Sequence, residues 1–268
     1  MRVIIDGRIK DQETIKLNLF SSAVHQGMGL KQNILYHKGR LYWYDEHIKK
    51  LEETARFCKF VVNFNHLEEE KIHTLLGYNG LSDNDALVKI LCLPDIGHCR
   101  TIILATQYNL PDIETNASIH NEPVTSVLNK FCTINNKGKS FWLEHYAMTN
   151  STEQVLFTNI KNRIIEGFES NIIALWNKNL YYVYPSQPYY QYIVQEKILK
   201  AATKKLGIKK LIAKGKGLSL ELLEKADEVV LINDIFIARR ITEIVSYTGR
   251  KIPLRSKNFA EKLREYFL

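Results

Sequence analysis

The residues of this chain that are best placed to do chemistry lie around one carboxylate, Glu166. It ends a short apolar run that begins at Arg163, and a polar segment ending in Ser170 and Asn171 separates it from a second apolar run that reaches Trp176. The pattern predicts a strand, a turn and a strand, with Glu166 where the chain turns inward. A carboxylate held there can keep a neighbouring group protonated. The alternative is that Glu166 lies at the solvated tip of a hairpin.

Lysines that precede Glu166 are the second candidates. Lys137 and Lys139 lie in a basic stretch, and the run that follows them, residues 141–147, has a helical pattern. A lysine whose pKa is lowered by burial has a neutral amine and can act as a base. The stretch is equally compatible with an exposed basic turn. Lys130 is a third lysine in the same region.

The composition allows a chain of 268 residues, 45% of them hydrophobic, to bury its core without disulfides or metals. The four cysteines are scattered, so they are expected to be reduced and mostly packed. Cys92, His98 and Cys99 are close together but lack the spaced pairs of a zinc site, and we predict no metal. The four cysteines are Cys58, Cys92, Cys99 and Cys132.

The formal net charge of +8 fits a nucleic-acid surface, an anionic small substrate or a lysine-rich proteome. The basic pairs Lys204–Lys205, Lys209–Lys210 and Arg239–Arg240 are dispersed, which predicts solvated faces and argues against nucleic-acid binding. The start of the chain predicts a strand and not a leader, and no apolar run could span a bilayer. We therefore expect a cytoplasmic protein without membrane contact.

Strands alternate with helices along the chain, which predicts an α/β or α+β fold in two lobes. Asp45 is expected to cap the first long helix, and Ser219 a later one. We predict an N-terminal α/β domain over residues 1–115, a linker over 116–124 that is flanked by prolines, and a C-terminal domain over 125–268. Predicted strands of the second domain cover 154–158, 163–166, 171–176, 181–184, 209–213 and 229–232, and its helices cover 192–206, 219–225 and 258–267.

Three segments together resemble the class IV aminotransferases, which are pyridoxal-phosphate enzymes of fold type IV. They are Glu166-Gly-Phe-Glu-Ser-Asn171, His47-Ile-Lys-Lys-Leu51 and Ala226–Asn233. Branched-chain and D-amino-acid aminotransferases and 4-amino-4-deoxychorismate lyase belong to this family. The resemblance implies a small N-terminal α/β domain, a larger C-terminal pseudo-barrel domain, pyridoxal 5'-phosphate as cofactor, a small amino substrate and a homodimer.

The resemblance also implies roles for single residues. Lys137 would bind the cofactor covalently and act as the base, and Glu166 would face the ring nitrogen. A lyase would eliminate pyruvate and leave 4-aminobenzoate, and the basic composition suits such a dianionic substrate; an aminotransferase is the other activity within the family.

The phosphate-binding elements of the family are altered in this chain. Lys50 replaces an arginine and offers only a point charge. The backbone N–H groups of Ile193 and Val194 would lie at a helix N-terminus, which binds phosphate. Asn233 and Asp234 stand at the third phosphate-binding element of the family, where an aspartate would repel a phosphate. The alternative is that the protein is a catalytically degenerate family member that binds a metabolite or partner without holding the cofactor tightly. A third hypothesis, an RNA-associated protein, rests on charge alone and is the weakest of the three.

Overall fold

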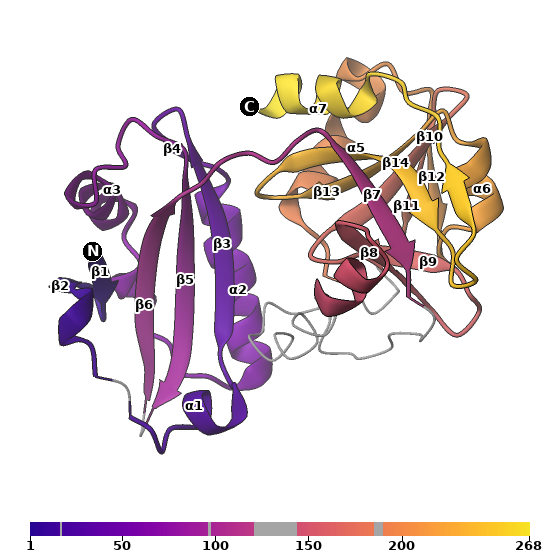
Figure 1. Cartoon of the computed structure of the whole chain (residues 1–268). Helices are drawn as coiled ribbons and strands as arrows, with labels where there is room; N and C mark the ends of the chain where they lie inside the picture. The colour runs from indigo at the N-terminus through magenta and orange to yellow at the C-terminus, as the bar shows by residue number, and fades with distance from the viewer. Residues whose placement is uncertain (17, 96–97, 121–143, 185–189) are drawn as a thin grey trace. The chain divides into compact units, whose positions relative to one another are not determined.

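The computed structural model of the protein describes residues 1–16, 18–95, 98–120, 144–184 and 190–268 (Figure 1). The described residues fall into two compact units that divide between Leu110 and Pro111. Each unit contains one β-sheet with helices packed against it. The mixed α/β architecture agrees with the predicted fold class.

The first unit is built on a mainly antiparallel sheet in the order β2-β1-β6-β5-β3-β4. Its long central hairpin pairs β5 with β6, and helix α2 packs against β3. Among the described residues, the strands are β1 (Arg2–Ile5), β2 (Arg8–Asp11), β3 (Leu30–His37), β4 (Arg40–Leu41), β5 (Ala86–Asp95) and β6 (His98–Gln107), and the α-helices are α1 (Ser22–Gln26), α2 (Tyr44–Cys58) and α3 (Glu69–Tyr78).

The second unit contains a nine-stranded mixed sheet in the order β12-β11-β10-β13-β14-β7-β8-β9, with β15 paired to β14. Helix α5 packs on β13 and β12, α6 on β10 and α7 on β14. The described strands are β7 (Glu114–Ile119), β8 (Gln154–Thr158), β9 (Ile164–Gly167), β10 (Asn171–Trp176), β11 (Asn179–Val183), β12 (Lys210–Lys214), β13 (Glu228–Asn233), β14 (Ile237–Val245) and β15 (Lys251–Pro253), and the helices are α5 (Ile193–Lys205), α6 (Leu220–Lys225) and α7 (Phe259–Phe267). Residues 144–149 are also helical.

This sheet curves back on itself as a half-barrel. Its last strand, β9, connects through a short turn to β10, which is third from the other end of the sheet. Backbone hydrogen bonds between Gly167 and Ser170, of 2.9 and 3.2 Å, close that turn. The concave side is filled by apolar side chains that include Leu156, Ile172 and Leu231, all nearly inaccessible to solvent. The curvature brings the turn after Glu166 next to the end of β13.

Two local predictions are wrong. The N-cap position of α2 is Trp43, in a left-handed conformation, and Asp45 lies in the first turn of the helix. Residues 116–119 of the predicted linker belong to β7, because alternate side chains such as Thr115 and Ala117 face the core. The remainder of that linker from residue 121 onward lies outside the described residues. Ser219 does cap α6, accepting a hydrogen bond from the Leu222 N–H at 3.2 Å.

Arg239 and Arg240 are also not on a solvated face. Both side chains are buried on β14, and both form ion pairs with glutamates. Arg239 pairs with Glu153, while Arg240 pairs with Glu114 at 2.9 Å and Glu261 at 2.8 Å. These pairs tie β14 to β7 and α7, so the two arginines stabilise the fold and are not available to an external anion.

Candidate active site

The turn after Glu166 is buried. Glu166 lies on β9 opposite Phe157, and only 8% of its surface is exposed. Gly167 leaves no room for a side chain, because an added Cβ would lie 2.4 Å from Ser170 Oγ and 2.8 Å from Leu231 Cδ2. Glu169 then adopts a positive φ of 47°, an uncommon conformation for a residue other than glycine. Glu166 is therefore held inside the second unit and is not at a solvated hairpin tip.

Asn171 fastens this turn to the segment that leads into helix α5. Its Nδ2 donates to the Tyr190 carbonyl at 2.6 Å, and its Oδ1 accepts from the Tyr192 N–H at 2.9 Å. Ser170, its neighbour, is also 1% exposed, but among the described residues its Oγ has no hydrogen-bond partner. The Ser-Asn pair thus combines an amide that binds two backbone groups with one buried hydroxyl that has no partner among the described residues.

The N-terminus of α5 is closed by a carboxylate of the chain itself. Val194 N donates to Asp234 Oδ1 at 2.7 Å. Val194 is fully buried and Asp234 is 2% exposed, so water does not compete for this bond. The next N–H, of Gln195, donates to the Tyr192 carbonyl at 3.2 Å. The N–H groups of Tyr192, Val194 and Gln195 are therefore all engaged by acceptors of this chain.

Asn233 shapes the tight turn between β13 and β14 that presents Asp234. Its Oδ1 accepts from the N–H groups of Ile235 at 2.9 Å and Phe236 at 2.8 Å, and its Nδ2 donates to the Glu169 carbonyl at 3.1 Å. The turn ends at Ile237, whose φ of 63° is strained for a β-branched residue. The Asn233 amide is thus used within the fold, and it links this turn to the turn after Glu166.

Tyr192 lies among the acidic groups of the site. Burial raises the pKa of its phenol well above the usual value, and the negative charges of Glu169, Asp234 and Glu166 raise it further, together with Tyr190. The rings of Tyr190 and Tyr192 pack edge to face with their centroids 4.9 Å apart. The start of α5 consequently has a negative electrostatic environment and keeps the Tyr192 hydroxyl protonated.

Two of the predicted site residues are not placed in this arrangement. Lys137, like Lys139 and Lys130, lies outside the described residues. Lys50 lies on α2 in the first unit. Its neighbour in the motif, His47, is buried; His47 Nδ1 lies 2.9 Å from Gln32 Oε1, and among the described residues its Nε2 has no hydrogen-bond partner. His47 therefore anchors α2 to β3, a role that its place in a recognised motif did not reveal.

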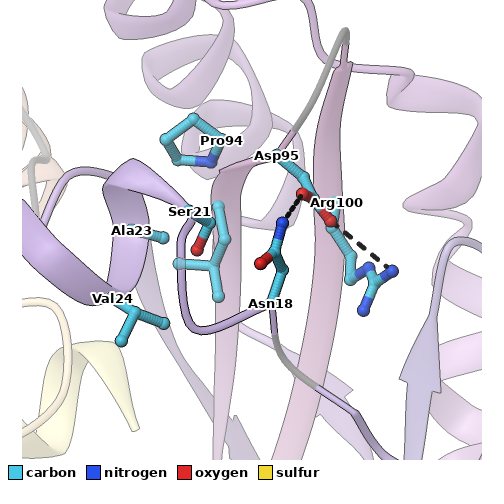
Figure 2. Close-up of a pocket in the computed structure, with 8 residues that line it drawn as sticks. Asn18, Ser21, Ala23, Val24, Pro94, Asp95 and Arg100 are labelled. Carbon is cyan, nitrogen blue, oxygen red and sulfur yellow. Dashed lines mark hydrogen bonds and ion pairs between the residues drawn. The ribbon is translucent and has the colours of Figure 1, made fainter.

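A separate hollow in the first unit lies beside α1 and the adjoining ends of β5 and β6 (Figure 2). Its basic residue, Arg100, lies 3.6 Å from Asp95 and 3.7 Å from Asp6, and donates to the Lys16 carbonyl at 2.8 Å. Because the guanidinium is engaged by the chain itself, this hollow is a weaker candidate site. The described residues contain no cluster of three histidines, cysteines or acidic residues that could hold a metal, and no helix among them could cross a membrane.

Comparison with known proteins identifies the family. Residues 32–244 match the model of the family described as amino-transferase class IV, which covers most of the chain. The chain belongs to this family. The predicted resemblance is therefore confirmed, and because class IV aminotransferases use pyridoxal phosphate, the predicted cofactor is confirmed for the family. No match was found among curated proteins.

Solved class IV aminotransferases share the fold. The branched-chain aminotransferase from Thermoproteus uzoniensis, determined with norvaline, is 19% identical, with a TM-score of 0.86 over 100% of this chain and 93% of the other. The branched-chain enzyme from Escherichia coli is 20% identical, with a TM-score of 0.85 over 99% and 92%. A hypothetical aminotransferase from Mycobacterium tuberculosis, in its PLP-bound form, is 15% identical, with a TM-score of 0.84 over 100% and 99%. These likenesses confirm the fold type.

The site of this class IV aminotransferase fits one end of pyridoxal phosphate and not the other. The buried Glu166 carboxylate suits a protonated ring nitrogen. The α5 N-terminus does not suit the phosphate, because Asp234 already occupies the Val194 N–H. The side chains of Asn233 and Asp234, predicted to contact the phosphate, bond to the protein backbone instead.

Proposed function

We propose that the protein is an enzyme that acts on small amino compounds at a site in the second unit beside Glu166. The observation that supports this most directly is the burial of Glu166, held by a turn that Gly167, Asn171 and Asn233 together fix. A carboxylate held inside a protein can stabilise a neighbouring cationic group. A protonated pyridine nitrogen would be such a group.

Within the family we propose elimination of pyruvate from an aminodeoxychorismate-like substrate first, and amino transfer second. The formal net charge of +8 supports an anionic substrate, although Arg239 and Arg240 contribute to that charge from ion pairs inside the fold. Lys137 is proposed as the catalytic lysine and Lys50 as a phosphate contact, both on the resemblance alone. A homodimer is proposed on the same basis, and we also propose a cytoplasmic location.

A second candidate is a family member that binds a metabolite without holding pyridoxal phosphate tightly. The hydrogen bond from Val194 N to Asp234 favours it, because this bond uses a donor that a phosphate would need. The two candidates differ in turnover, so they can be separated by assay.

The test is product formation at saturating pyridoxal phosphate. We expect the protein to release pyruvate and 4-aminobenzoate in equal amounts from aminodeoxychorismate, or failing that to transfer an amino group from a branched-chain amino acid to 2-oxoglutarate. Lys137→Ala should abolish either reaction, whereas Lys161→Ala, at an exposed lysine, should not. Activity lost in Lys139→Ala and kept in Lys137→Ala would show that the lysine is misassigned. No product in any assay would reject the enzyme and favour the second candidate.

A further inference from the structure

Helix α5 begins in the interior of the second unit, where its first N–H groups need acceptors. A helix of 13 residues has a partial positive charge at this end and normally binds an anion or a capping side chain there. Tyr192, at the N-cap position, provides no side-chain acceptor. The acceptor is the Asp234 carboxylate, 2.7 Å from Val194 N, which arrives from the turn after β13.

At the N-terminus of helix α7, in the same unit, a buried carboxylate also accepts hydrogen bonds from backbone N–H groups. The buried Glu228 carboxylate accepts from the N–H groups of Lys257 at 2.9 Å, Phe259 at 3.0 Å and Ala260 at 2.9 Å. Glu228 thus completes the N-terminus of α7 using groups of the protein alone. At α5, Asp234 likewise accepts from one N–H group, that of Val194, so an added anion would have to displace it from that group.

The surroundings of Asp234 disfavour an additional negative charge. Glu166 and Glu169 act on the same tyrosine, Tyr192, as Asp234 does. A phosphate dianion at this helix end would find the Val194 N–H taken and would be repelled by the carboxylate that takes it. Glu166, by contrast, is a buried carboxylate that suits a protonated ring nitrogen. The site therefore offers the Glu166 carboxylate at the ring end and repulsion at the phosphate end.

We propose that Asp234 is a specificity-determining residue that closes the phosphate subsite, so that the second unit selects unphosphorylated pyridine compounds over their 5'-phosphates. The ring beside Glu166 is part of the proposed function, whereas the rejection of phosphate depends on Asp234 alone. An experiment can therefore reject the proposed catalysis without rejecting the proposed selectivity, and the reverse.

The test measures non-covalent binding, with pyridoxine and pyridoxine 5'-phosphate as probes, because neither carries an aldehyde that could react with lysine. Dissociation constants are measured by equilibrium dialysis for the full chain, with inorganic phosphate as competitor. Asp234→Asn keeps an oxygen acceptor for Val194 N and removes the charge, and Asp234→Thr offers a hydroxyl. Glu228→Gln is the matched control, since it removes a buried carboxylate from the other helix N-terminus. Circular dichroism checks that each variant is folded.

We expect the wild type to bind pyridoxine and to show no competition from inorganic phosphate. In Asp234→Asn the affinity for pyridoxine 5'-phosphate relative to pyridoxine should rise at least about tenfold, because a full charge is removed beside the dianion. Glu228→Gln should leave this ratio unchanged. If Asp234→Asn is unfolded, Asp234→Thr must show the rise.

Three results would overturn the proposal: tighter binding of the phosphate ester by the wild type, an unchanged ratio in the folded Asp234 variants, or no binding of pyridoxine to any variant. Selective binding of pyridoxine by a protein that forms no product would instead reject the enzymatic function and leave the selectivity in place.

Discussion

Ser170 and Asn171 are sequence neighbours that are equally buried, but only the Asn171 side chain forms hydrogen bonds among the described residues. Asn171 satisfies two backbone groups of the segment before α5, whereas Ser170 Oγ satisfies none among the described residues. A sequence motif gives both residues equal weight, but the structure gives the stabilising role to Asn171. Its removal would leave the Tyr190 carbonyl and the Tyr192 N–H without their partner.

We predict that Asn171→Ala lowers the free energy of unfolding by about 2–4 kcal/mol, because each buried group left unsatisfied costs about 1–3 kcal/mol. Ser170→Ala should be neutral or raise stability by up to about 1 kcal/mol, since it removes a buried hydroxyl without a partner. Urea unfolding of the two variants measures both values. Equal losses in the two variants would contradict the assigned roles.

At the scale of elements, α2 is joined to β3 through a histidine that is neutral in the fold. Burial, with a smaller contribution from the charge of Lys50, lowers the pKa of His47 from 6.5 to about 3. The unfolded chain therefore binds a proton here below about pH 6.5, while the folded chain does not until about pH 3. The contribution of His47 to stability is present above pH 6.5 and is lost as the pH falls.

We predict that His47 alone makes the free energy of unfolding fall by about 1.4 kcal/mol per pH unit as the pH decreases from 6.5 toward 3. His47→Gln, which can still donate to Gln32, should remove this part of the slope, whereas His145→Gln at an exposed position should leave it unchanged. Denaturant titrations at several pH values provide the comparison. Parallel curves for the wild type and His47→Gln would show that His47 is not buried in the neutral form.

How well each element could be predicted depended on the strength of its boundary signals. Strands β8 and β10 were predicted at their observed bounds, because polar turns flank continuous apolar runs. Strand β14 was missed, because Arg239 and Arg240 interrupt its apolar pattern and their partners, Glu153, Glu114 and Glu261, are distant in sequence. For Asp234 the sequence predicted only repulsion of a phosphate, and the hydrogen bond from Val194 N was not predicted, since a pattern of residues does not show that a carboxylate bonds to a helix N-terminus.

For the whole molecule, membership of the class IV aminotransferases establishes the fold and the family cofactor, while the phosphate subsite departs from them. Our central claim is that the second unit binds a pyridoxal compound beside Glu166 and that Asp234 discriminates against its phosphate. A covalent adduct on the reactive lysine reports which lysine binds the aldehyde, and whether the adduct carries a phosphate reports on the phosphate subsite.

The most direct measurement is borohydride reduction of the protein in an equimolar mixture of pyridoxal and pyridoxal 5'-phosphate, followed by mass spectrometry of the modified lysine. The two adducts differ by one phosphate, and comparison of wild type with Asp234→Asn cancels the different reactivities of the two aldehydes. We predict modification at Lys137 and a ratio of phosphorylated to unphosphorylated adduct that is at least about tenfold lower in the wild type than in Asp234→Asn. An equal ratio in the two proteins, or modification scattered over exposed lysines in both, would contradict the account.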